Sequence, residues 1–298
     1  MKNLFEVTGG SVAGRDHVFS GRNNQDTFSV KVTDDAIVVI VADGCGSSPH
    51  SEVGAQLGAN LCTEAVQNDI SRLLHHDDIV LLRHFTKRDS VSMDIVQWFM
   101  GYIRESVLGQ IQTLVKRMGG DFSRTIQDYF LFTLVGAVIT RHTTWIFSLG
   151  DGVAFVNGEN VYNGSFAGNA PPYLAYGLVK TTLHDADPSL LQFRIHDVRP
   201  TESVQSLLIG TDGVMDFMRG AERIVPGKNE PVGPLSQFWE EDRYFKNPDM
   251  MRRRLSLVGR EGTHIDWERR VVEKIPGLLA DDTTMVVVRR KNRSHCEE

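Results

Sequence analysis

The stretch AIVVIVADGCGSS, Ala36–Ser48, decides how the rest of the sequence is read. Its apolar run Ala36–Ala42 is dominated by β-branched residues and does not alternate with polar ones, which predicts a strand buried on both faces. The run ends abruptly at Asp43, which a glycine and several small residues follow. We therefore predict that a rigid core strand projects Asp43 into a functional site at its end.

Helix-like and strand-like segments extend outward from this stretch. A helix is expected to run on from Ser51, where small residues such as Gly54 and Gly58 recur at three- and four-residue spacing and let the helix lie very close to a sheet. A second helix is expected over Val91–Lys116, because its apolar residues have a helical period. Further strands are predicted over the segments Thr27–Val32, Leu131–Ile139, Thr143–Leu149, Val153–Val156, Gln192–Val198, Gln205–Gly210 and Thr284–Arg290.

The connections between these strands indicate the fold class. Those at Arg141-His142 and Asp151-Gly152 are short enough for antiparallel hairpins and too short for crossover helices. Strands lie at both ends of the sequence, with helical blocks between them. This order predicts one α+β domain over residues 1–298, whose sheets are completed by the C-terminal strand.

One part of the chain has no clear period. Residues 218–276 are irregular, with turn signals and with helices expected near Leu235–Glu241 and Trp267–Lys274. We predict an irregular and partly helical segment here, which is either a flap beside the site or only packing.

Composition limits the class of protein. The chain has 298 residues, 41% hydrophobic and 23% charged, and a formal net charge of -6, which is typical of a globular protein and argues against a nucleic-acid-binding surface. Its three cysteines, Cys45, Cys62 and Cys296, fit neither a disulfide framework nor a zinc ligand set. The N-terminus lacks the apolar core of a signal peptide, and no apolar run approaches the length of a membrane span. A cytoplasmic protein without membrane contacts is expected.

Acidic residues follow the predicted strands in a repeated way. Asp-Gly pairs at Asp43, Asp151 and Asp212 each come directly after an apolar run, and Asp281-Asp282 directly precedes the last strand. Such pairs are also common surface turns, which remains the simplest explanation for any one of them. In an antiparallel sheet, however, strand ends and strand starts share a rim, so the four can meet there. Clustered carboxylates repel one another and need cations or protons, and oxygen-only ligation favours Mg²⁺ or Mn²⁺.

The acidic motifs, taken in order, resemble a known family. The series is Asn24-Gln25-Asp26, Val41-Ala42-Asp43-Gly44, Gly150-Asp151-Gly152, Thr211-Asp212-Gly213-Val214 and Asp281-Asp282-Thr283. In order and spacing it is similar to the protein phosphatase 2C family of metal-dependent serine/threonine phosphatases, across nearly the whole chain. The bacterial-type branch is the most similar, because GCGSSPHSEVGA resembles its signature after the first Asp-Gly.

The resemblance implies both a fold and a metal centre. The expected fold is a four-layer α/β/β/α sandwich of two antiparallel sheets flanked by helices. Two Mn²⁺ or Mg²⁺ ions are expected at one rim, and a third, weaker site is associated with Asp151. By motif, Asp43 bridges both ions, Gly44 contributes its carbonyl oxygen, and Asp212 and Asp281 ligate one ion. Asp26 and Gln25 would contact water molecules held by the ions, and Asp282 stands where the family often has Asn.

The residues expected to contact substrate lie near the first two motifs. Many family members bind the phosphate with an arginine at the position of Gly21, so Arg22, one residue later, or Arg15 is expected to replace it through a bidentate contact. Ser47 belongs to the small residues that leave room for substrate. His50 either donates a proton to the leaving group or only caps the following helix. Cys45 replaces a histidine of eukaryotic members, and its surroundings do not fit a cysteine-nucleophile phosphatase.

The predicted function is hydrolysis of phosphomonoesters. The most direct hypothesis is a serine/threonine phosphoprotein phosphatase that uses a metal-activated water and acts on targets of a serine/threonine kinase. Two alternatives stay open. The same site could hydrolyse a small-molecule or nucleotide phosphoester, or the fold could be a catalytically silent regulatory binding module.

Overall fold

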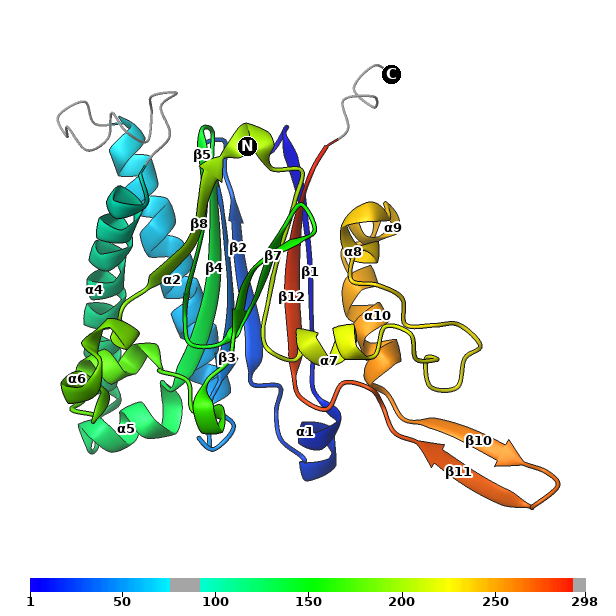
Figure 1. Ribbon diagram of the computed structural model, residues 1–298. Coiled ribbons are helices and arrows are strands. Elements are labelled where there is room, and N and C mark those ends of the chain that lie inside the picture. Colours follow the sequence, from blue (N-terminus) through cyan, green and yellow to red (C-terminus); the bar gives the residue numbers. More distant parts are fainter. Residues whose placement is uncertain (76–91, 292–298) are drawn as a thin grey trace.

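Two five-stranded antiparallel sheets form the centre of the molecule, as the computed structural model shows for residues 1–75 and 92–291 (Figure 1). The first sheet has the order β1-β12-β9-β6-β7 and the second the order β2-β3-β4-β5-β8. The first consists of β1 (Phe5–Val12), β12 (Thr283–Arg290), β9 (Ser206–Gly210), β6 (Gly152–Val156) and β7 (Glu159–Gly164). The second consists of β2 (Asp26–Val32), β3 (Ala36–Gly44), β4 (Phe132–Thr140), β5 (Thr143–Leu149) and β8 (Arg194–Pro200).

Helices cover the outer face of each sheet (Figure 1). The second sheet is covered by α2 (Ser51–His75), α4 (Met93–Met118) and α5 (Phe122–Tyr129). The first sheet is covered by α7 (Val214–Arg219), α8 (Gln237–Glu240), α9 (Arg243–Lys246) and α10 (Met250–Gly259). The remaining short helices are α1 (Arg15–Ser20), α6 (Leu183–Ala186), η1 (Ala167–Asn169), η2 (Leu174–Leu178), η3 (Pro188–Leu191) and η4 (Thr201–Ser203). The expected four-layer sandwich is therefore confirmed. Val91, the first residue of the predicted second helix, lies outside the described residues.

The alternation of β3 between two cores explains its uninterrupted apolar sequence. Ile37, Val39 and Val41 face the core between the sheets, whereas Val38 and Ile40 face the core beneath α2 and α4. All five are at most 1% exposed. The prediction of a strand buried on both faces is thus correct, and burial on both sides fixes the strand that ends in Asp43.

The small residues of α2 allow it to lie against the second sheet. A Cβ atom on Gly54 would come within 1.8 Å of the carbonyl oxygen of Tyr129, and one on Gly58 within 2.1 Å of the ring of Phe132. No side chain fits at either position, so Gly58 sets the distance between α2 and β4, and Gly54 sets the distance between α2 and the C-terminal end of α5. This close approach agrees with the expectation from their spacing.

The connection at Asp151 is not a hairpin, which corrects the prediction for this turn. β5 pairs with β4 and β8, whereas β6 pairs with β7 and β9 in the other sheet. Gly150 and Gly152 have φ angles of 94° and 124°, a region that glycine adopts without strain, and the chain crosses there from one sheet to the other. Asp151 therefore lies on a link between the two sheets. The hairpin at Arg141-His142 is confirmed by the pairing of β4 with β5.

The segment 218–276 divides into packing helices and a hairpin. Helix α8 confirms the first helix predicted there, but the helix expected over Trp267–Lys274 is wrong. Instead, β10 (Gly262–Asp266) pairs with β11 (Val271–Ile275) and the hairpin projects from the body (Figure 1). The carboxylate of Asp266 accepts hydrogen bonds from the backbone N–H groups of Glu268 and Arg269 and so closes a turn, and β-branched Val271 and Val272 favour the strand that follows.

Among residues 1–75 and 92–291, each helix is too short or too polar to cross a membrane.

Candidate metal centre

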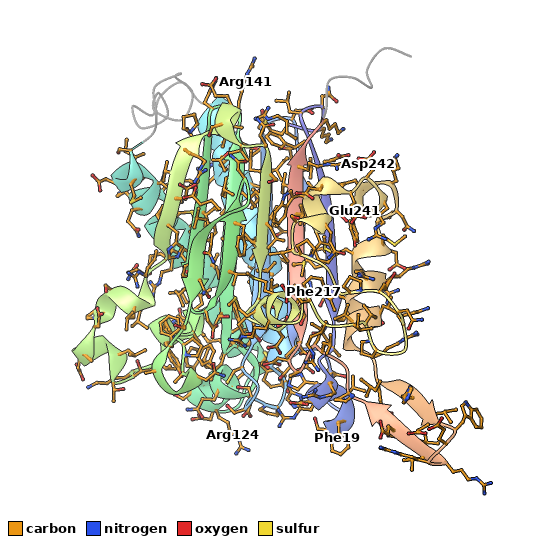
Figure 2. The ribbon with its side chains drawn as sticks, turned by 45° about the vertical axis from the view of Figure 1, so that its right-hand side comes forward. Phe19, Arg124, Arg141, Phe217, Glu241 and Asp242 are labelled. Carbon is orange, nitrogen blue, oxygen red and sulfur yellow. The ribbon has the colours of Figure 1, made fainter. Side chains whose placement is uncertain are left out.

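Ends of several strands gather the acidic residues at one end of the sandwich. Asp26 begins β2 and lies directly opposite Asp43 of β3, which in turn lies opposite Thr133 of β4. On the other sheet, Asp212 follows β9, and Asp281 and Asp282 precede β12. Figure 2 shows Arg124 of α5 and Phe19 of α1 at this end, and Arg141 of the β4–β5 turn at the opposite end.

A cavity of about 240 Å³ lies between these strand ends. Its lining includes Asp43, Asp151, Asp212 and Asp281, so acids that are far apart in the sequence share one small space. Asp43 comes from the second sheet, Asp212 and Asp281 come from the first, and Asp151 comes from the link between the two. The geometry thus brings together four of the acids that the sequence singled out.

Burial and mutual repulsion make the central carboxylates hard to ionise without a cation. Burial raises the pKa of Asp43 well above its ordinary value, and the charges of Asp26, Asp212, Asp151 and Asp281 raise it further. Burial likewise raises the pKa of Asp212 to about 7, with contributions from Asp151 and Asp281. A divalent cation bound among them would restore the charged forms.

Asp26 lies behind Asp43 and is held by a threonine of the other sheet. Burial raises the pKa of Asp26 well above the ordinary value, although a hydrogen bond of 2.6 Å from Thr211 Oγ1 to Asp26 Oδ2 opposes that shift. Thr211 precedes the Asp212-Gly213 pair, so it couples the two sheets next to the acids. Burial also raises the pKa of Asp151, against a hydrogen bond from Thr133.

Two carboxylate oxygens provide a direct test of whether a metal fits here. Asp26 Oδ1 and Asp151 Oδ1 are both buried and have no hydrogen-bond partner in the described structure. A buried anionic oxygen without a donor is costly unless a proton or a cation compensates for it. Together with the oxygen-only acids that line the cavity, these orphan oxygens fit hard divalent ions such as Mn²⁺ or Mg²⁺.

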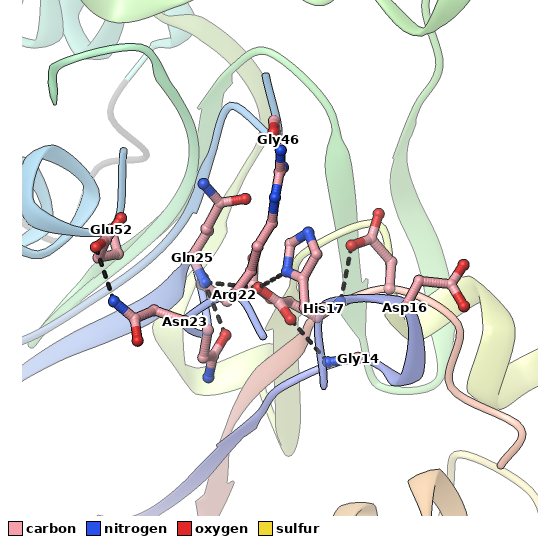
Figure 3. Close-up of polar contacts among 12 residues, drawn as sticks. Gly14, Asp16, His17, Arg22, Asn23, Gln25, Gly46 and Glu52 are labelled. Atoms are coloured by element: carbon pink, nitrogen blue, oxygen red, sulfur yellow. Dashed lines mark hydrogen bonds and ion pairs between the residues drawn. The ribbon is translucent and has the colours of Figure 1, made fainter. Parts of the chain in front are cut away.

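Asp282 has a different role from its neighbour Asp281. Its carboxylate is 2% exposed and accepts the backbone N–H of Gly14 at 2.7 Å and that of Gln25 at 2.6 Å. Nδ1 of His17 lies 2.8 Å from the same carboxylate (Figure 3). Asp282 therefore ties the segment from Gly14 to Gln25 to the start of β12. His17, Asp281 and Asp282 also form a group whose possible ligand atoms lie within 4.8 Å of one another.

The side chain of Gln25 is used within the protein. Its Nε2 donates to Ser51 Oγ at 2.6 Å and to the carbonyl oxygen of Ser48 at 3.3 Å, so it secures the loop that follows Asp43. Its Oε1 is buried without a partner. Gly44 lines the cavity, and its N–H donates to the carbonyl oxygen of Gln25. A Cβ atom at Gly44 would lie 2.8 Å from Ser51 Oγ, which explains the glycine.

The residues expected to contact substrate differ in how they lie relative to the cavity. The guanidinium of Arg22 donates to the carbonyl oxygen of Gly46, at the edge of the cavity (Figure 3). Arg15 pairs with Asp16 at 3.0 Å and donates to the carbonyl oxygen of Gly277. Ser47 lines the cavity.

His50 is not among the residues that line the cavity. Its ring stacks on Tyr129 with a centroid distance of 4.8 Å.

Several residues of the cavity were not anticipated. Thr133, Asn169, Pro171 and Tyr173 line it together with His17 and Cys45. Asn169, Pro171 and Tyr173 come from the irregular segment between β7 and β8, which has no motif and no clear period. Only the Pro171-Pro172 pair signals that this segment does not continue a strand.

Comparison with known proteins identifies the family. The family model described as Protein phosphatase 2C matches residues 13–251, most of the chain and four of the five acidic motifs. The chain belongs to the protein phosphatase 2C family. A search of curated proteins found no significant match.

Solved phosphatase structures share the fold of this protein phosphatase 2C member. The serine/threonine phosphatase Stp1 from Staphylococcus aureus is 12% identical, with a TM-score of 0.53 and coverage of 97% of this chain and 96% of that chain. A serine-threonine phosphatase 2C from Toxoplasma gondii is 13% identical, with a TM-score of 0.54 and coverage of 97% and 95%. A bacterial serine phosphatase is 11% identical, with a TM-score of 0.53 and coverage of 97% and 99%. At these identities the likeness shows the fold, and the predicted family and fold are both confirmed.

Proposed function

We propose that the chain is a metal-dependent phosphomonoester hydrolase that removes phosphate from phosphoserine and phosphothreonine in proteins. The observation that carries this proposal is the single cavity in which Asp43, Asp151, Asp212 and Asp281 converge from both sheets. Membership of the protein phosphatase 2C family and the likeness to the serine/threonine phosphatase Stp1 support it. We also propose that residues 1–298 act as one catalytic unit in the cytoplasm, on targets of a serine/threonine kinase.

The proposed ligands are those that the family resemblance implies. Asp43, Gly44 through its carbonyl oxygen, Asp212 and Asp281, which all line the cavity, would hold two Mn²⁺ or Mg²⁺ ions. Asp151 would serve a third, weaker site, and Asp26, with its unpartnered Oδ1, would orient water. Gln25 would contact such water through its unpartnered Oε1, because its Nε2 already donates a hydrogen bond to Ser51. When bound, the ions would make a water molecule more acidic, so that it can act as the nucleophile, and would neutralise charge on the phosphoryl oxygens.

Other residues of this chain support that chemistry. Thr211 holds Asp26 and Thr133 holds Asp151, so the carboxylates keep their positions in the metal-free protein. Arg22 is the proposed phosphate-binding cation, because its guanidinium already reaches the loop at Gly46 next to the cavity. Arg15 is the weaker candidate, since Asp16 and Gly277 already engage it.

The test is phosphate release from a phosphothreonine peptide by the purified chain. We expect turnover with Mn²⁺, none with EDTA, and a loss of at least about 1,000-fold in Asp43→Asn. Asp94→Asn is the matched control, because Asp94 is an exposed acid of α4. Activity that survives both EDTA and Asp43→Asn would reject the proposal. Faster hydrolysis of nucleotides than of every phosphopeptide would support the small-molecule alternative instead.

A further inference from the structure

A second, larger hollow opens beside the metal cavity. This hollow, here called the α5 cleft, has a volume of about 1050 Å³ and lies between α5 and the segment 169–183. It shares Cys45, Ser47, Asn169, Pro171 and Tyr173 with the metal cavity, so the two spaces adjoin. A substrate whose phosphate reaches the carboxylates would therefore have the α5 cleft directly beside it.

The α5 cleft has an apolar patch in a wall that is otherwise polar. Val179 and Leu183 contribute half-buried aliphatic side chains from the segment that leads into α6, whereas Gln127, Asp128 and Lys180 contribute polar groups. Tyr173 and Tyr176 stand at an edge-to-face angle of 76° with ring centroids 5.3 Å apart, and both are half-buried. An aliphatic side chain that packs on Tyr176, Val179 and Leu183 would be removed from water, so this patch favours an apolar side chain over a charged one.

A third hollow also adjoins the metal cavity. It has a volume of about 620 Å³ and shares Asp151, Asn169, Asp212 and Asp281 with the metal cavity. Its lining includes exposed Asp16, and Asp216 paired with Arg219 at 3.2 Å. The metal cavity thus has two hollows beside it. A peptide with its phosphorylated residue in the metal cavity could occupy both, whereas a nucleotide, which ends at its phosphate, would need only one.

We propose that the α5 cleft binds an apolar side chain next to the phosphorylated residue and so selects among phosphoprotein substrates. This inference rests on the proposed function and adds the substrate class: phosphopeptides with Leu, Ile, Val or Phe within two residues of the phosphothreonine. The occupant is a segment of the substrate, because the cleft adjoins the cavity that is proposed to bind the phosphate. Tyr176 and Leu183 are the specificity residues that can be changed without touching the carboxylates.

Two peptide series test the proposal with the full-length chain and Mn²⁺, and each peptide carries one phosphothreonine. The first series has Leu, Gly or Asp at one of the two positions before the phosphothreonine, and the second has the same residues at one of the two positions after it. We expect kcat/KM to be about tenfold higher for Leu than for Asp at one or more of these positions, because burial of one aliphatic side chain has roughly that effect. AMP is assayed in parallel as the nucleotide outcome.

Variants connect this preference to the α5 cleft. Tyr176→Ala should reduce the preference for Leu to about twofold or less, and Leu183→Glu should shift it towards a peptide with Arg at the same position. Trp98→Ala is the matched control, since this aromatic residue is 59% exposed on α4 and is not among the residues that line the cleft. Tyr176→Ala and Leu183→Glu must keep their turnover of the Gly peptide, which shows that they fold and that the metal centre is intact.

A binding measurement separates this inference from the proposed function. Fluorescence anisotropy of labelled phosphopeptides with the Asp43→Asn chain should show tighter binding of the Leu peptide, and Tyr176→Ala in the same background should remove the difference. Equal turnover and equal binding of the Leu, Gly and Asp peptides would overturn the α5 cleft as a specificity site, yet leave the phosphatase proposal intact. A Leu preference in binding without turnover of any phosphopeptide would support the cleft and reject the phosphatase. Preferred hydrolysis of AMP would overturn both.

Discussion

His17 and Asp282 form a pair in which Nδ1 of the imidazole lies 2.8 Å from a buried carboxylate oxygen. The same carboxylate accepts the N–H groups of Gly14 and Gln25, so one side chain near the C-terminal end organises the loop that leads into Asp26. A buried carboxylate is costly unless hydrogen-bond donors compensate for it, and Asp282 has two backbone N–H donors. Its neighbour Asp281 is exposed and lines the cavity, and its Oδ1 accepts the backbone N–H of Asp282 at 2.8 Å.

We therefore expect Asp282→Asn to destabilise the protein more than Asp281→Asn. The amide group of asparagine can accept fewer of the surrounding N–H groups, and the loss should be about 2 kcal/mol in the free energy of unfolding. Urea denaturation in EDTA measures the free energy of unfolding, with both variants free of metal. Asp281→Asn should be neutral or stabilising there, because it removes a charge that repels other acids. Equal stability of the two variants would contradict the role assigned to Asp282.

The raised pKa values predict how the metal-free protein responds to pH. Burial raises the pKa of Asp212 to about 7, above the unfolded value of 3.8, so the folded state binds more protons than the unfolded state between these values. The contribution to stability is full at low pH and is lost as the pH rises towards about 7. In EDTA, the titration of Asp212 should lower the Tm of the protein by roughly 5 °C between pH 5 and pH 7.5.

Addition of Mn²⁺ should reverse this loss, because the cation replaces the protons, and its stabilising effect should be greater at pH 7.5 than at pH 5.5. Thermal unfolding with and without Mn²⁺ measures both effects. Asp212→Asn should make the pH profile in EDTA shallower, since asparagine does not titrate whereas Asp43, Asp26 and Asp151 still do. Exposed Asp94→Asn should leave the profile unchanged. A profile that is the same in the wild type and in Asp212→Asn would show that Asp212 does not titrate in this range.

The two candidate arginines are expected to differ in kinetics. Arg22→Ala should lower kcat/KM for a phosphothreonine peptide by about 10- to 100-fold, because a charge-assisted contact with phosphate is lost. Arg22→Lys should recover only part of it, since lysine cannot bind two phosphate oxygens with the planar fork of arginine. Arg15→Ala serves as the paired control, with an expected loss below about threefold. The reverse order of the two effects would transfer the role to Arg15.

The close approach of α2 to the C-terminal end of α5 gives a test of packing. Gly54→Ala should lower the free energy of unfolding by about 2 kcal/mol, because its Cβ would lie 1.8 Å from the carbonyl oxygen of Tyr129. Gly109→Ala on α4 is the control, since a Cβ there meets no atom within 4 Å and alanine favours the helix by up to about 1 kcal/mol. Chemical denaturation of both variants should therefore give shifts of opposite sign.

The strands of the core were the most predictable part of the fold. β3 and β5 are apolar along their whole length because both of their faces are buried, and their bounds differ little from the predicted ones. β1 escaped prediction because Gly9 and Gly10 interrupt its pattern. Both are glycines for packing reasons: a Cβ on Gly9 would lie 3.1 Å from the ring of Phe28, and one on Gly10 would lie 2.7 Å from the backbone nitrogen of Arg252.

The acids of the site could be found from the sequence because each one lies at the end of a strand with a strong pattern. Their surroundings could not. Tyr173 and Asn169 reach the cavity from a segment whose course is set by tertiary contacts. Thr211 and Thr133 look like ordinary strand residues in the sequence, because their contacts with the acids depend on how the two sheets pack together. The position of Asp151 between the sheets also depends on a chain crossing that a short Asp-Gly turn does not reveal.

That crossing has a mechanical consequence. Asp43 belongs to one sheet and Asp212 to the other, and the backbone at Gly150–Gly152 is a direct covalent bridge between the two at the same rim. A cation held by both carboxylates would link the two sheets. A shift of one sheet relative to the other would separate the carboxylates, so cation binding depends on the alignment of the two sheets.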